Sequence, residues 1–221
     1  MGRFSREQDV RGSEKWLRLA VKRASLDGPI LEHMNGALSI RWVSPLETDG
    51  YSEYRDAAFL DKIACRQLSP RLADFWPAMG PQWDALGLSD KGDVLLVEAK
   101  AHVEEMCTNP CGAEADTSLH KIEHALAVTQ RACHAAPRAS WTQLFYQLGN
   151  RLAHLYFLRN EGVDAWLVLV DFIGDVEMNG PMAPAEWDAA YAVAYHVMGL
   201  KPEAGLMQYV FHVRPDIKSL G

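Results

Sequence analysis

The sequence predicts an α/β fold in which helices flank a central sheet. Two runs, residues 94–97 and 164–172, are short, strongly apolar and rich in β-branched side chains, as is typical of buried strands. Between them, residues 141–159 repeat leucine at helical spacing, so a helix separates the two strands. Strands that alternate with helices are characteristic of the α/β class.

The N-terminal half adds four further elements. Residues 13–24 have apolar side chains at helical spacing, and residues 38–43 alternate in polarity, which predicts a helix and then a strand at an edge of the sheet. Residues 51–67 predict a second helix with one apolar stripe. Residues 83–88 predict a strand, which a turn-rich loop joins to residues 94–97 as an antiparallel hairpin.

The C-terminal half is marked by helix caps and stops. Ser140 is a candidate N-cap for the helix at residues 141–159. Residues 184–198 predict another helix, with proline in its first turn and Gly199 as its C-terminal cap. Residues 206–213 then predict a short terminal strand.

The chain reads as a single domain over residues 1–221, because no repeat or long linker divides it. We expect a core at about residues 50–172, an N-terminal extension at about 1–49, and a C-terminal helix and strand at about 173–221. Hydrophobic residues make up 48% of the chain and charged residues 23%, which is enough to build a sizeable core.

The most informative motif is an isolated Asp84 followed by Glu98-Ala99-Lys100 at the end of the apolar strand. Side chains alternate across a strand, so Glu98 and Lys100 share one face and Ala99 points to the other. Two charges that follow a buried strand are costly to desolvate unless they are paired or bound to a metal. The predicted hairpin would bring Asp84 near Glu98.

This residue set suits a divalent metal. Mg²⁺ prefers oxygen ligands and typically takes one or two carboxylates besides water and phosphate oxygens. Asp84 and Glu98 would supply the carboxylates, and the carbonyl of Ala99 a third oxygen. Lys100 would orient or help deprotonate an attacking water, or contact the scissile phosphate.

Asp84 with Glu98-Ala99-Lys100 resembles the signature of the PD-(D/E)XK nuclease superfamily, the restriction-endonuclease-like proteins. The resemblance implies an α-β-β-β-α-β core around a central mixed sheet. It also implies hydrolysis of nucleic acid, DNA in the first instance, with Mg²⁺ or with Mn²⁺ in its place, and a homodimer that cuts two strands. The match departs from the signature in one respect, since Trp83 stands before Asp84 and Pro81 lies three positions before it.

The resemblance also directs attention to Glu53, because family members often carry an acid on the first core helix, facing the metal. Glu53 lies near the start of the helix predicted at residues 51–67 and would be an additional catalytic acid. The alternative is that an acid at this position simply interacts with the positive end of the helix.

Three more side chains are candidates for contact with substrate. The helix at residues 141–159 presents amides and an arginine on its polar stripe, and Gln147 and Arg151 can reach phosphate oxygens or a metal-bound water. The alternative is an ordinary solvated face. His102 follows Lys100 by two residues and either assists proton transfer or is a surface histidine.

Charge stands against the nuclease interpretation. The formal net charge is −7, whereas nucleic-acid-binding proteins usually show a basic footprint. We therefore expect weak or transient substrate binding, or help from a partner subunit. The alternative is a non-catalytic binding or scaffold protein that retains the nuclease fold. No apolar run reaches membrane-spanning length and no signal peptide is evident, which predicts a cytoplasmic protein with no membrane partner.

The spacing of cysteines and histidines raises a third hypothesis. Cys107 and Cys111 precede His120 and His124, and the two histidines, four residues apart, would share a helix face. Such a set could form a structural zinc site in an interaction module. The alternative is a plain loop that leads into a helix at Ser118.

Overall fold

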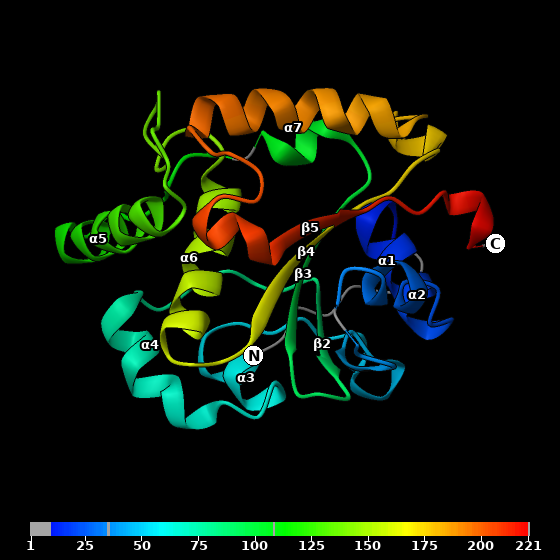
Figure 1. The fold of residues 1–221 in the computed structure, drawn as a ribbon, viewed down its shortest axis with the longest axis horizontal. Coiled ribbons are helices and arrows are strands. Elements are labelled where there is room, and N and C mark those ends of the chain that lie inside the picture. The colour runs from blue at the N-terminus through cyan, green and yellow to red at the C-terminus, as the bar shows by residue number, and fades with distance from the viewer. Residues whose placement is uncertain (1–9, 35, 108, 221) are drawn as a thin grey trace.

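A five-stranded mixed sheet forms the centre of the protein (Figure 1). The computed structural model describes residues 10–34, 36–107 and 109–220. The strands follow the order β1-β2-β3-β4-β5 across the sheet. They are β1 (Ile40–Ser44), β2 (Ala85–Ser89), β3 (Val94–Lys100), β4 (Ala165–Asp171) and β5 (Val210–Val213). The predicted α/β class is therefore confirmed.

The strand pairing changes direction in the middle of the sheet. β1 pairs with β2 and β2 with β3 in antiparallel fashion, so the predicted hairpin is confirmed. β3 pairs with β4 and β4 with β5 in parallel, and the chain between β3 and β4 crosses over through helices. β1 lies at one edge, as its alternating pattern predicted, and β5 lies at the other. The sheet thus draws strands from all three predicted parts of the chain.

Seven helices flank the sheet in the part of the chain that the structure describes. They are α1 (Gly12–Lys22), α2 (Asp27–Leu31), α3 (Asp56–Lys62), α4 (Ser69–Phe75), α5 (Asp116–Ala132), α6 (Tyr146–Asn160) and α7 (Pro184–Met198). None of these helices is long and apolar enough to cross a membrane.

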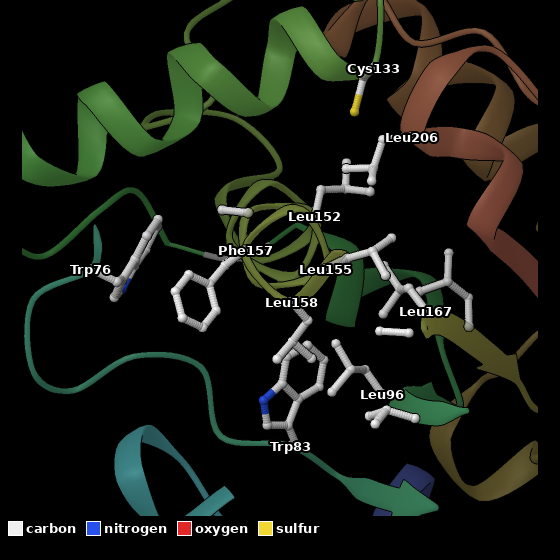
Figure 2. Packing of buried hydrophobic residues seen from close by; sticks show 14 of the residues in the cluster. Trp76, Trp83, Leu96, Cys133, Leu152, Leu155, Phe157, Leu158, Leu167 and Leu206 are labelled. Carbon is white, nitrogen blue, oxygen red and sulfur yellow. The ribbon is translucent and has the colours of Figure 1, made fainter. Parts of the chain in front are cut away.

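The sheet separates two apolar cores, and strand β3 contributes to both because its residues alternate between the two faces of the sheet. Leu96 packs with side chains from α3 to α7, among them Leu152 and Leu155 of α6 (Figure 2). Leu95 and Val97 face the other core, which α1 and α2 cover. All seven residues of β3 are buried, including the two charged ones at its end.

The helix predicted at residues 51–67 is wrong in length. Tyr51 and Asp56 have positive φ angles of 57° and 52°, which a continuing right-handed helix excludes, so α3 begins only at Asp56. It ends before Ala64, which has a φ of 58°. A separate turn of 3₁₀ helix covers Arg66–Leu68.

Two further boundaries differ from prediction. Residues 141–145 form turns and α6 begins at Tyr146, because Phe145 has a φ of 55° and the indole of Trp141 is anchored by its hydrogen bond of 3.0 Å to the carbonyl of Met198. Within the predicted strand 206–213, the 3₁₀ helix Gly205–Tyr209 replaces the first half. The helix at 184–198 and its left-handed cap at Gly199 are confirmed.

Candidate active site

The motif residue Glu98 lies at the centre of a buried ion-pair cluster. Only 3% of its surface is exposed. One carboxylate oxygen, Oε1, accepts a hydrogen bond of 2.9 Å from Nζ of Lys100, and Oε2 accepts one of 2.5 Å from Nε of Arg151. The predicted common face for Glu98 and Lys100 is therefore found, and both charges on the buried strand are paired.

Arg151 ties three segments together. It comes from α6, is buried, and donates from Nη2 to the carbonyl of Gln82 at 2.8 Å. Its guanidinium also lies over the indole of Trp83, 4.9 Å from the ring centroid. Arg151 thereby fixes the segment that carries Asp84 against the end of β3.

Lys100 is held from two sides. Besides Glu98, its Nζ donates to Oε1 of Gln147 at 2.8 Å. These three residues line a narrow cavity that Tyr191 of α7 also borders. Gln147 and Arg151, the two α6 residues singled out from the sequence, therefore both reach the motif.

Asp84 lies immediately before β2, across from the end of β3. Its Oδ2 accepts a hydrogen bond of 2.8 Å from the backbone N–H of Ala99. The N–H and C=O of one strand residue point to the same side of the strand, so the Ala99 carbonyl faces the Asp84 side as well. Asp84 lies close enough to Glu98 for the charge of Glu98 to act on its ionisation, and the Ala99 carbonyl lies at the same end of the β2–β3 hairpin.

The two carboxylates differ in their ionisation. Burial raises the pKa of Asp84 well above its usual value, and the neighbouring charge of Glu98 raises it further. Burial would also raise the pKa of Glu98, but the charges of Arg151 and Lys100 outweigh that effect and lower the pKa. Asp84 therefore takes up a proton more readily than Glu98, because fewer positive charges lie beside it.

A polar cavity of about 200 Å³ opens beside Asp84. Glu53 lines it, and the charge of Glu53 also raises the pKa of Asp84. The prediction that Glu53 lies on a helix is wrong, since it belongs to the irregular segment before α3. Its predicted place beside the site agrees with the structure.

The same cavity is lined from the opposite side by Glu14 and Arg18 of α1, which sequence reasoning missed. They stand about 70 residues before Asp84 in the chain, so no local motif connects them to it. The available signal was the predicted helix at residues 13–24, whose first turn contains Glu14.

Other candidates lie elsewhere. His102 interacts with Glu104 and Glu105, at 2.9 and 3.2 Å, and is not part of the cluster around Glu98. β3 ends at Lys100, so His102 lies beyond the strand and does not share its face. His154, on the polar stripe of α6, is buried against Trp76 and other rings, and burial lowers its pKa to about 3, so it stays neutral.

The predicted zinc ligands are not gathered into a cluster. In residues 10–34, 36–107 and 109–220, no three His, Cys, Asp or Glu side chains are arranged to hold a metal ion by themselves. His120 and His124 are exposed on α5, and Cys107 is exposed in the loop before it.

The donor set at the hairpin end nevertheless fits Mg²⁺. This ion needs only one or two protein carboxylates, because water and phosphate oxygens complete its shell. Each carboxylate oxygen has two lone pairs, so Glu98 can keep its bonds to Lys100 and Arg151 while it shares an oxygen with a cation. Asp84, whose negative charge is opposed by that of Glu98, gains most from a cation placed between them.

Comparison with known proteins adds no relative. No family model, no curated protein and no solved structure matches the chain.

Proposed function

We propose that the protein is a divalent-metal-dependent nuclease that hydrolyses phosphodiester bonds, with DNA as substrate. The observation that carries the proposal is that Asp84, Glu98, the Ala99 carbonyl and Lys100 lie together at one end of the β2–β3 hairpin. Asp84 bonds to the backbone of Ala99, and Lys100 bonds to Glu98. Carboxylate oxygens bind a divalent metal ion, and a neighbouring lysine can position a phosphodiester.

The order of elements supports the proposal. Along the chain, α1, β1, β2, β3, α6 and β4 follow the α-β-β-β-α-β succession that the superfamily resemblance implies. β2 pairs with β1 and with β3 in antiparallel fashion, and β4 joins β3 in parallel after the helical crossover. In this arrangement α1 occupies the place that we assigned from the sequence to residues 51–67.

Each side chain has a role in this mechanism. Asp84, Glu98 and the Ala99 carbonyl would hold Mg²⁺, or Mn²⁺ in its place. When bound, the ion lowers the pKa of a water and neutralises charge on the phosphate. Lys100 positions the attacking water or contacts the phosphate, and Gln147 holds the lysine in place through its hydrogen bond. Arg151 positions Glu98 through its hydrogen bond to Oε2.

A second candidate function is a binding or scaffold protein without catalysis. Both oxygens of Glu98 already accept hydrogen bonds from cations, so the cluster is also a complete structural ion-pair network. The net charge of −7 favours this alternative too.

Cleavage assays separate the two functions. Labelled single-stranded and double-stranded DNA and RNA are incubated with Mg²⁺, Mn²⁺ or EDTA and the wild type, Asp84→Asn or Lys100→Met. We expect metal-dependent cutting of DNA that falls by at least about 10²-fold in each variant. The matched controls are Asp74→Asn and Lys201→Met, which change exposed residues and should leave cutting unaltered.

Cutting that survives both Asp84→Asn and Lys100→Met would refute the assignment of the site. Absence of cutting by the folded wild type on every substrate and metal would favour the scaffold function. Size-exclusion chromatography with light scattering, run on the same samples, tests the homodimer that cutting of two strands would use.

A further inference from the structure

The outer face of α1 is locally basic in an acidic protein. Residues 11–23 contain five basic side chains and one acidic side chain, whereas the whole chain has a net charge of −7. Lys15, Arg18 and Lys22 follow each other at spacings of three and four residues, which places them along one face of the helix. The charge is therefore concentrated along a line rather than scattered.

Arg18 lies at the centre of this line and is the least exposed of the three, with 11% of its side chain accessible. Its guanidinium lies over the ring of Tyr51, 4.6 Å from the centroid, and its Nη2 donates to Oε1 of Glu14 at 2.5 Å. Its Nε is buried and has no hydrogen-bond acceptor among the described residues. A guanidinium that Tyr51 and Glu14 hold in place, and that borders two hollows, is suited to contact an oxyanion.

Arg18 and Tyr51 also border two neighbouring hollows. One is the cavity that contains Asp84 and Glu53. The other is an open groove of about 390 Å³, lined in addition by Lys15 and Lys22. A basic groove along α1 thus leads into the acidic cavity of the candidate active site.

The outer lysines form exposed ion pairs with described residues. Nζ of Lys22 lies 2.9 Å from a carboxylate oxygen of Glu47, and both side chains are mostly exposed. Lys15 lies 3.9 Å from Glu177, and both are again exposed. Exposed pairs of this kind contribute little and are screened by salt, so a phosphate can replace either glutamate.

We propose that the groove along α1 binds the sugar–phosphate backbone of the DNA substrate next to the scissile phosphate. Arg18 is the inner phosphate contact, and Lys15 and Lys22 are the outer ones. This inference rests on the proposed nuclease function, one of whose proposed metal ligands, Asp84, lines the adjoining cavity. It also accounts for how an acidic protein holds a polyanion, since the cations that matter are gathered where the strand enters the site.

Equilibrium binding without cleavage tests the groove. Fluorescein-labelled DNA, duplex or single-stranded, is titrated with protein in EDTA and in Ca²⁺ at 50 to 200 mM KCl, and Kd is measured by anisotropy. In the double variant Lys15→Gln/Lys22→Gln we expect the slope of log Kd against log salt to fall by about 0.7–0.9 for each lysine. Both side chains are mostly exposed, so the fold is retained.

The matched control is Arg131→Gln/Lys201→Gln, which removes the same charge from exposed positions on α5 and after α7. These elements lie on the opposite side of the molecule from α1 (Figure 1). The control should retain the wild-type slope, because only a local contact releases counterions. A fall of equal size in both double variants would show a general charge effect and would overturn the groove.

The inner contact is tested with Arg18→Lys, which keeps the charge and loses the planar fork. We expect DNA binding weakened by about tenfold or more, with an unchanged circular dichroism spectrum. If the lysine and Arg18 variants bind as the wild type does while Asp84→Asn abolishes cutting, the groove is wrong and the nuclease stands. If binding depends on these residues and no substrate is cut, the groove stands and catalysis fails.

Discussion

Two buried acidic clusters lie side by side on one face of the sheet, and they balance their charge in different ways. Lys100 of the Glu98 cluster is the register partner of Asp171 on the neighbouring strand. Asp171 is fully buried, as Glu98 nearly is. The Glu98 cluster is built from formal charges, whereas the Asp171 cluster is built around one acid with hydroxyl and imidazole partners.

Within the Asp171 cluster every polar group has its partner. The hydroxyl of Tyr191 donates to Oδ1 of Asp171 at 2.9 Å, and Nδ1 of His212 lies 2.7 Å from Oδ2. The other ring nitrogen of His212 lies 2.8 Å from the hydroxyl of Tyr195. Burial, and then the charge of Asp171, raises the pKa of Tyr191, so this tyrosine remains a donor.

The contrast indicates which cluster is prepared for a ligand. Asp171 is fully buried, and both of its oxygens have partners within the cluster. Asp84 lines a cavity, and its charge is opposed by that of Glu98. The cavity gives a cation access to Asp84, whereas Asp171 is closed off from solvent. Unsatisfied charge of this kind is concentrated at functional sites.

The largest effect should follow loss of the central cation. In Arg151→Met the carboxylate of Glu98 keeps only Lys100, and we expect the free energy of unfolding to fall by about 3–5 kcal/mol. Urea denaturation measures it, with the exposed Arg131→Met as control. The double variant Glu98→Gln/Arg151→Met should recover part of the loss, because no carboxylate is left without its arginine. No recovery would mean that packing of Arg151 dominates.

The Asp171 cluster should respond less, because it loses a neutral donor. Tyr191→Phe removes one hydrogen bond to a buried carboxylate, which we expect to cost about 1–3 kcal/mol of unfolding free energy. Tyr156→Phe is the matched control, and thermal or urea unfolding gives the comparison. A loss as large as that of Arg151→Met would abolish the distinction between the two clusters.

Metal ions should stabilise one cluster only. At ten times its dissociation constant, Mg²⁺ bound only to the folded state raises the free energy of unfolding by about 1.4 kcal/mol. The shift should vanish with EDTA and in Asp84→Asn, and persist in Tyr191→Phe. Differential scanning fluorimetry provides the readout, and a shift that persists in Asp84→Asn would place the ion elsewhere.

The smallest effect should be a gain. The raised pKa of Asp84 means that its ionised form opposes folding, and this cost appears as the pH rises through the folded-state pKa. Without metal, Asp84→Asn should therefore be more stable than the wild type by on the order of 1 kcal/mol at neutral pH. The advantage should disappear below the unfolded-state pKa of an aspartate.

The contribution of Glu98 to the free energy of unfolding should change with pH in the opposite direction to that of Asp84. Its pKa is lowered, so its contribution to stability is present above the unfolded-state pKa and is lost as the pH falls through the folded-state pKa. Stability measured in Glu98→Gln relative to wild type should show its deficit at neutral pH and lose it in acid. Parallel pH profiles for Asp84→Asn and Glu98→Gln would contradict the assigned charges.

The sequence predicted the centre of the fold better than its periphery. Strands β3 and β4 are signalled by apolar runs that contain β-branched residues, and β2 by an apolar run before a turn-rich loop; each of these signals is local in the sequence. The start of α6 was missed because Trp141 and Phe145, which fit a helical pattern, are held in turns by tertiary contacts. The same limit applies at Tyr51, where a positive φ angle overrides an apolar stripe.

The residues of the candidate site that share a strand face or a helix face were predicted from the sequence. Glu98 and Lys100 on one strand face, and Gln147 and Arg151 on one helix face, follow from periodicity. The pairing of Arg151 with Glu98 does not follow from periodicity, because it depends on the distance between α6 and the sheet. Arg18 was missed for the same reason, since only the tertiary fold brings α1 to the cavity.

The long sequence interval between Glu98 and Arg151 has a consequence for synthesis. Arg151 lies 53 positions after Glu98 in the chain. Because a chain grows from its N-terminus at about 5–20 residues per second, Arg151 is added about 3–10 s after Glu98. Until then the β2–β3 hairpin carries a carboxylate that cannot be buried with its main counter-charge. The nascent chain therefore has no complete site, and the emergence of α6 sets the moment at which one can form.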